Sequence, residues 1–162
     1  MAKITLKGKV CNTSGELPRV GSQIAKFSLV DRNLAELASD QLLGKTVVLN
    51  VFPSIDTPVC ALSTKRFNQE AAKLNNVVIV CVSKDLPFAF SRFCAAENIE
   101  AVQFGSDFRD GAFGKLFGLT IVDGPLKGLL ARAVIVINPK GEVTYTELVP
   151  EIANEPNYSS VL

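Results

Sequence analysis

The sequence predicts an α/β fold in which helices flank a central mixed β-sheet. Two uncharged apolar runs, 46–52 (TVVLNVF) and 77–83 (VVIVCVS), have the length and composition of strands that are covered on both faces. The segment between them, 58–74, has helical spacing, and a third apolar run, 133–138 (AVIVIN), follows late in the chain. A strand, a helix and a second buried strand in succession predict a β–α–β unit with parallel strands.

The first elements are short. Runs of β character at 4–10 and 27–30 open the chain and predict an N-terminal β extension. Helix 58–74 should then pack on the sheet through apolar residues that fall near one face, namely Val59, Leu62, Phe67, Ala71 and Leu74.

The second half of the chain completes the sheet. Its pattern predicts, in order, a helix at 86–97, an irregular glycine-rich segment at 101–130 with a short helix at 111–117, the strand 133–138, an antiparallel edge strand at 142–148 and a helix from 155 onward. The order β-α-β-α, insertion, β-β-α matches a thioredoxin-like fold. Because no repeat or linker interrupts it, we expect one domain over residues 1–162.

Composition excludes several classes of function. Lysine and arginine (17) balance aspartate and glutamate (16), so net charge gives no reason to expect binding to nucleic acid or an anionic membrane. The chain has no histidine, which excludes histidine-ligated metal sites and any nucleophile activated by an imidazole base. We expect no metal and no cofactor. The start lacks the apolar core of a signal peptide and no run is long enough to span a membrane, so we expect a cytoplasmic protein.

Cys60 is the residue that the local sequence singles out. Thr57 is a favoured N-cap residue, and Pro58 suits the first position of a helix. This places Cys60 in the first helical turn, where unpaired backbone N–H groups and the helix dipole favour a thiolate over a thiol. Cap, proline and cysteine together predict a reactive thiol.

The other three cysteines are less distinctive. Cys81 lies inside a buried strand run and reads as a small hydrophobic residue, and Cys11 has no evident role. Cys94 lies at helical spacing from Phe90, which favours a core position, but it could also form a disulfide with an oxidised Cys60. Such a bond needs Cα atoms within about 7 Å and would require partial unwinding of one helix. The chain has no C-x-x-C motif, which disfavours a zinc site or a thioredoxin-type dithiol.

The pattern Pro53-x-x-x-Thr57-x-x-Cys60 resembles the active-site signature of the peroxiredoxins. The longer strings FPSIDTPVC, KRFNQEAAKL, DLPFAFSRFCAAE and DGPLKGLLARAVIVI resemble the bacterial thiol peroxidases, an atypical two-cysteine subfamily. The likeness covers nearly the whole chain. The family usually has glycine where this chain has Pro58, a change that the first turn of a helix tolerates.

The resemblance implies a role for each matching residue. Cys60 would be the peroxidatic cysteine and Cys94 the resolving one, joined after oxidation in an intramolecular disulfide. Thr57 would hydrogen-bond both the thiolate and the peroxide, Pro53 would shield the sulfur from water, and Arg132 would be the cation beside it. Without the family, an arginine that precedes a buried strand reads as a surface residue.

The resemblance further implies an antioxidant enzyme that is a homodimer and is reduced by thioredoxin. It would reduce hydrogen peroxide and organic hydroperoxides through a Cys60 sulfenic acid. Apolar residues expected near the site, Phe90, Phe93 and the 126–130 loop, favour organic hydroperoxides, although they could equally form core or dimer contacts. Two rival functions share the reactive thiol: a thiol–disulfide oxidoreductase, and a redox sensor or chaperone-like protein without turnover.

Overall fold

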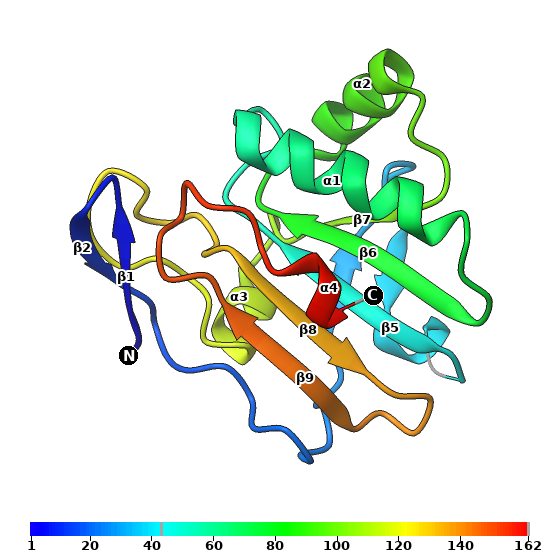
Figure 1. Ribbon diagram of the computed structural model, residues 1–162, viewed down its shortest axis with the longest axis horizontal. Helices are drawn as coiled ribbons and strands as arrows, with labels where there is room; N and C mark the ends of the chain where they lie inside the picture. The colour runs from blue at the N-terminus through cyan, green and yellow to red at the C-terminus, as the bar shows by residue number, and fades with distance from the viewer. Residues whose placement is uncertain (43, 162) are drawn as a thin grey trace.

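The computed structural model describes residues 1–42 and 44–161 (Figure 1). Its elements in chain order are β1 (Lys3–Leu6), β2 (Lys9–Asn12), β3 (Ser28–Val30), β4 (Glu36–Ala38), the 3₁₀ turn η1 (Ser39–Gln41), β5 (Thr46–Val51), α1 (Pro58–Ala71), β6 (Val77–Ser83), α2 (Pro87–Glu97), β7 (Gln103–Ser106), α3 (Ala112–Leu116), β8 (Ala133–Ile137), β9 (Val143–Leu148) and α4 (Tyr158–Val161). None of the helices within the described residues is long and apolar enough to cross a bilayer.

A seven-stranded mixed sheet forms the centre of the fold, with strand order β4-β3-β7-β6-β5-β8-β9. The β–α–β prediction is confirmed, because β5 and β6 pair in parallel on either side of α1 in the chain. The antiparallel edge strand is confirmed as well: β9 pairs only with β8 among the described strands. Since β5 and β8 are antiparallel neighbours, the start of β8 lies beside the end of β5, with Ala133 opposite Val51.

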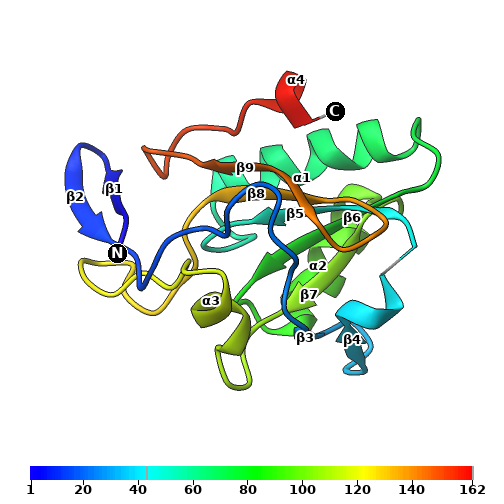
Figure 2. The same ribbon diagram turned by 90° about the horizontal axis from the view of Figure 1, so that it is seen from below.

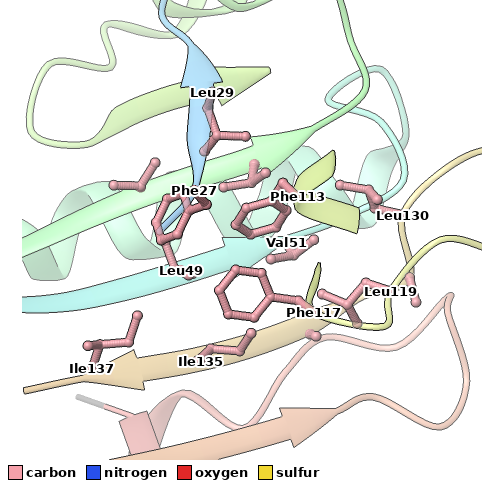
Figure 3. Packing of buried hydrophobic residues seen from close by; sticks show 14 of the residues in the cluster. Phe27, Leu29, Leu49, Val51, Phe113, Phe117, Leu119, Leu130, Ile135 and Ile137 are labelled. Atoms are coloured by element: carbon pink, nitrogen blue, oxygen red, sulfur yellow. The ribbon is translucent and has the colours of Figure 1, made fainter. Parts of the chain in front are cut away.

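The two faces of the sheet carry separate apolar clusters. In β5, Leu49 and Val51 face one cluster, whereas Val48 faces the other, as the two-residue period of a strand requires. Helices α1 and α4 lie on one side of the sheet and α3 on the other (Figure 2). The α3 side is filled by an aromatic group in which Phe27 meets Phe113 and Phe117 edge to face, at centroid distances of 5.3 and 5.6 Å (Figure 3).

The N-terminal prediction needs a correction. The run 4–10 is not one strand but a hairpin, because Lys7 and Gly8 adopt positive φ values of 51° and 83° and turn the chain back. This β1–β2 hairpin forms its own two-stranded sheet, apart from the central one (Figure 1). Its end contacts the 120–123 segment, where the Asn12 backbone N–H donates to Asp123 Oδ1 over 2.7 Å.

The predicted packing face of α1 is only partly correct: Phe67 is buried and Ala71 packs against the apolar cluster under the helix, as expected. Leu62 and Leu74 are 52% and 37% exposed, whereas the buried residues are Cys60, Ser63, Thr64 and Phe67. These four have the spacing i, i+3, i+4, i+7 of one helical stripe. The hydroxyl of Ser63 is accommodated there because it donates to the Cys60 carbonyl over 3.0 Å. The buried stripe of the helix therefore combines Cys60 and Phe67, which belong to the apolar cluster, with the polar Ser63 and Thr64.

Candidate active site

Cys60 occupies the third residue of α1, as the sequence predicted. β5 ends at Val51 and a short turn leads to Pro58, the first helical residue. The side chain of Cys60 is fully buried, in the apolar cluster under α1 and α2. The sulfur therefore has the position of a helix-start thiol but no direct exposure to solvent.

Arg132 supplies a cation at this sulfur. It directly precedes β8, and the pairing of β8 with β5 brings it to the carboxyl end of β5. Its Nη2 donates to Cys60 Sγ over 3.1 Å, and its Nε donates to the Ile152 carbonyl over 2.8 Å. Only 1% of the residue is exposed, so the surface position that the sequence alone suggested is wrong. A buried guanidinium requires a charge partner, and a Cys60 thiolate meets that requirement.

The second terminal nitrogen of Arg132 is unused. Its Nη1 is buried and has no hydrogen-bond partner among the described residues. Buried donors are almost always paired, and an orphan in a site is a place where a ligand atom can bind. The guanidinium can thus hold the sulfur and one further acceptor at once.

Thr57 stands at the N-cap position with extended backbone angles, but its side chain does not cap the helix. Its hydroxyl instead donates to the Ser54 carbonyl over 2.9 Å. This is the one hydrogen bond recorded for that hydroxyl in the described structure, and no bond to Cys60 accompanies it. Because the proton is directed to Ser54, the hydroxyl oxygen keeps its lone pairs free to accept a hydrogen bond from a ligand.

A cavity of about 280 Å³ adjoins the site. Pro53, Thr57 and Arg132 all contribute to it, so the structure brings together these three residues and the Cys60 sulfur that Arg132 touches. Apart from Lys7, the remaining wall is apolar and consists of Leu6, Pro58, Val59, Leu126, Ile152 and Ala153. Leu126 belongs to the loop that we expected near the site, whereas Phe90 and Phe93 are absent from the wall. Phe90 instead packs on Phe104, with ring centroids 4.9 Å apart.

Sequence reasoning missed the residue that organises the turn before Cys60. Asp85, between β6 and α2, accepts the Ser54 hydroxyl at Oδ1 and the Ile55 amide N–H at Oδ2, each over 2.7 Å. The Ser83 hydroxyl also donates to Oδ2, over 2.5 Å. Asp85 begins the string that the family resemblance includes, but nothing in its local pattern indicates a contact 30 residues away.

Cys94 lies on α2, 6% exposed, in the same apolar cluster as Cys60. Both cysteines are free thiols and form no disulfide. Burial raises the pKa of Cys94 above its ordinary value, and the nearby Arg32 guanidinium opposes this shift. Arg32 and Cys94 line the same hollow of about 360 Å³, which gives the Cys94 side of α2 an opening that is separate from the Cys60 cavity.

The remaining cysteines lie in the interior. Cys81 is fully buried in β6, as predicted, and its sulfur is 3.6 Å from Nδ2 of Asn50. Burial raises its pKa to about 12. Cys11 is buried in β2, away from the cluster that holds Cys60.

The fold and the helix-start thiol define the class of the protein. The Redoxin family matches residues 19–162. A peroxiredoxin-like protein from Aquifex aeolicus superposes with a TM-score of 0.94 at 41% identity, covering 99% of this chain and 94% of that one. The predicted thioredoxin-like fold is thereby confirmed.

Two sequence relatives narrow the class. A protein named thiol peroxidase from Mycobacterium tuberculosis is 56% identical over 162 residues, which is all of this chain and 97% of the relative. Another of that name from Corynebacterium glutamicum is 51% identical over 162 residues, all of this chain and 98% of the relative. The chain belongs to the thiol peroxidase family, and the enzyme class that the sequence predicted is confirmed.

Proposed function

We propose that this protein reduces hydrogen peroxide and organic hydroperoxides at Cys60, with Cys94 as the resolving cysteine and thioredoxin as the reductant. The observation that carries the proposal is the 3.1 Å contact between Arg132 Nη2 and Cys60 Sγ in the first turn of α1. A buried cation at a helix-start sulfur favours the thiolate, which is the reactive form of cysteine.

In the first step, the Cys60 thiolate attacks one oxygen of the hydroperoxide. A sulfur–oxygen bond forms as the O–O bond breaks, and the departing oxygen takes up a proton and leaves as water or an alcohol. Cys60 is then a sulfenic acid, two electrons more oxidised than the thiol. Thr57 accepts a hydrogen bond from the bound peroxide. Arg132 Nη1, which has no partner among the described residues, donates to the oxygen that gains negative charge.

Thiolate population alone does not account for fast reduction. An ordinary thiol is only a few per cent ionised at neutral pH, so full ionisation gains about thirtyfold, on the order of 2 kcal/mol. The larger share must come from alignment of the peroxide and from stabilisation of the departing oxygen. Pro53 supports both by keeping water from the sulfur at the cavity wall.

In the second step, the Cys94 sulfur attacks the sulfenic sulfur of Cys60. A disulfide forms and the hydroxyl leaves as water. Because both cysteines are buried within helices, local unwinding of α1 or α2 precedes this bond. The dithiol of thioredoxin then reduces the disulfide by exchange and returns both thiols.

Two wider features belong to the same proposal. A cycle that needs continuous reduction of a disulfide suits the cytoplasm, where thiols are kept reduced. We propose a homodimer because large apolar side chains are exposed near the cysteine-bearing helices: Leu62, Leu86 and Phe88 are 52%, 51% and 66% exposed. Sedimentation analysis of the reduced protein tests this part.

A coupled assay tests the enzymatic cycle. With thioredoxin, thioredoxin reductase and NADPH supplied, added peroxide should cause sustained NADPH consumption. Cys60→Ser should abolish both peroxide loss and NADPH consumption. Cys94→Ser should reduce one equivalent of peroxide and then stop, without NADPH consumption, because no disulfide forms for thioredoxin to reduce. Cys11→Ser, a matched control away from the site, should leave NADPH consumption unchanged. Stoichiometric oxidation without turnover would favour the redox sensor, and reduction of insulin disulfides would favour a thiol–disulfide oxidoreductase.

A further inference from the structure

We infer that Asp85 is a positioning residue for peroxide reduction, which acts through Ser54 on the hydroxyl of Thr57. The inference rests on the proposed role of Thr57 in binding peroxide. It assigns a function to a carboxylate that lies outside the Cys60 cavity and contacts neither Cys60 nor Arg132.

The hydrogen bonds form a continuous path from the carboxylate to the site. Ser54 Oγ donates to Asp85 Oδ1 over 2.7 Å and accepts the Asp56 amide N–H over 3.1 Å, which fixes the orientation of Ser54. The Ser54 carbonyl in turn accepts both the Thr57 amide N–H, over 3.2 Å, and the Thr57 hydroxyl, over 2.9 Å. The direction of the Thr57 oxygen lone pairs therefore depends on where Asp85 holds Ser54.

Asp85 is itself held in place. Its backbone N–H donates to Ser83 Oγ over 3.1 Å, while that hydroxyl donates to Oδ2. The hydroxyl of Ser106 on β7 donates to the Asp85 carbonyl. The end of β6 and the end of β7 thus anchor the carboxylate, and the turn before α1 is tied to the sheet rather than only to its own helix.

The two oxygens of the Asp85 carboxylate accept three hydrogen bonds, from the Ser54 hydroxyl, the Ile55 amide N–H and the Ser83 hydroxyl. Replacing either oxygen by a donor group therefore loses at least one of these bonds. In Asp85→Asn, an NH₂ group replaces one of these oxygens while the shape is kept. If the NH₂ group faces Ile55, it meets the Ile55 N–H, and two donors cannot form a hydrogen bond. If it faces Ser54, the Ser54 hydroxyl must accept a hydrogen bond instead of donating one. Either arrangement shifts Ser54, and small misplacements in a site reduce rates strongly.

The test is a double-mutant cycle on the second-order rate of Cys60 oxidation by hydrogen peroxide. Asp85→Asn should lower kcat/KM roughly tenfold or more in the wild-type background and have almost no effect in a Thr57→Val background. The thiolate fraction of Cys60, read from ultraviolet absorbance, should stay unchanged. Asp40→Asn is the matched control, because that carboxylate is exposed and, among the described residues, forms an ion pair with Lys26 alone.

Ser54 provides a second route in case Asp85→Asn folds poorly. Ser54→Ala should reproduce the loss, and Ser54→Thr, which keeps a hydroxyl, should restore most of the rate. A purely structural role of Asp85 predicts equal losses in both backgrounds, which would overturn the inference. An Asp85→Asn rate equal to that of Asp40→Asn, or a Thr57→Val variant as fast as wild type, would overturn it too. A wild-type chain without peroxide turnover would overturn the proposed function itself and this inference with it.

Discussion

The guanidinium of Arg132 and the sulfur of Cys60 lie 3.1 Å apart, although 72 residues separate them in the chain. Antiparallel pairing of β5 with β8 produces this contact, because it places the residue before β8 next to the turn after β5. The site therefore depends on strand pairing in the sheet. The contributions of its individual residues can be measured one at a time by substitution.

Arg132→Lys should keep a positive charge near Cys60 but lose the fork that reaches the sulfur and a second acceptor together. We expect the thiolate fraction to fall little, while the rate of peroxide reduction falls about 10²- to 10³-fold, the usual effect of removing a donor to a developing oxyanion. Stopped-flow oxidation and thiolate absorbance measure the two quantities. Losses in the same proportion, in this variant or in Arg132→Ala, would contradict a role beyond ionisation.

Arg32→Gln should slow disulfide formation at neutral pH. Arg32 lowers the pKa of Cys94 against the effect of burial, so its removal moves that pKa upward and the thiolate appears only at higher pH. The rate of conversion of sulfenic acid to disulfide should rise with pH in both proteins, with the profile of the variant displaced toward alkaline pH. Arg109→Gln, whose guanidinium stacks near Phe108, is the control and should keep the wild-type profile.

Cys81→Ala should make the fold less sensitive to alkali. The pKa of Cys81 is raised from 9.0 to about 12 in the folded protein, so between these values the unfolded chain loses a proton that the folded chain keeps. Unfolding free energy then falls as pH rises, by about 1.4 kcal/mol per pH unit for one group. Urea titrations at several pH values in this range give the unfolding free energy, which should fall less steeply with pH for the variant than for the wild type. Equal dependence on pH would show that Cys81 does not contribute.

Pro58→Gly should lower the unfolding free energy by about 1 kcal/mol, because glycine makes the unfolded chain more flexible and proline is favoured at the first helical residue. Peroxide reduction should change little, since the contacts of Arg132 and Thr57 do not involve this side chain. Thermal denaturation measures the loss of stability, and initial rates of peroxide reduction measure activity. A rate loss comparable to that of an Arg132 variant would be contrary to this expectation.

Leu126→Ala should separate the two substrate types. Leu126 is part of the apolar wall of the cavity, and loss of its contact with an organic substituent should cost about 1 kcal/mol. We expect kcat/KM for cumene hydroperoxide to fall about fivefold while that for hydrogen peroxide stays the same. Parallel losses for both substrates would mean that the cavity does not bind the organic group.

Local sequence patterns predicted the secondary structure correctly where the signal was strong and was not overridden by tertiary packing. The start of α1 at Pro58 and the buried runs of β5, β6 and β8 were predicted correctly, because proline position and apolar composition act within a few residues. The packing face of α1 was predicted only in part, since counting apolar residues identified Phe67 but favoured Leu62 over Ser63 and Thr64. Only the sheet beneath the helix decides which stripe is buried.

β7 was missed for a similar reason. Gly105 weakens its strand signal, yet a Cβ there would lie 2.6 Å from Cδ1 of Leu29, so the close packing of β3 against β7 requires glycine. The cavity wall likewise combines Leu6, Leu126 and Ile152, which no local pattern connects. Arg132 was assigned only through the family resemblance, because a buried arginine is recognisable by its partner rather than by its neighbours in sequence.

The two polar residues in the buried stripe of α1 affect how stably the helix that carries Cys60 packs on the sheet. Ser63 and Thr64 stand where larger aliphatic side chains would bury more apolar area, and each Å² of such area contributes roughly 25 cal/mol. Segments with less buried apolar area open at lower free energy than the rest of a fold. By this measure α1, which carries Cys60, detaches from the sheet more easily than a leucine-faced helix of equal length would.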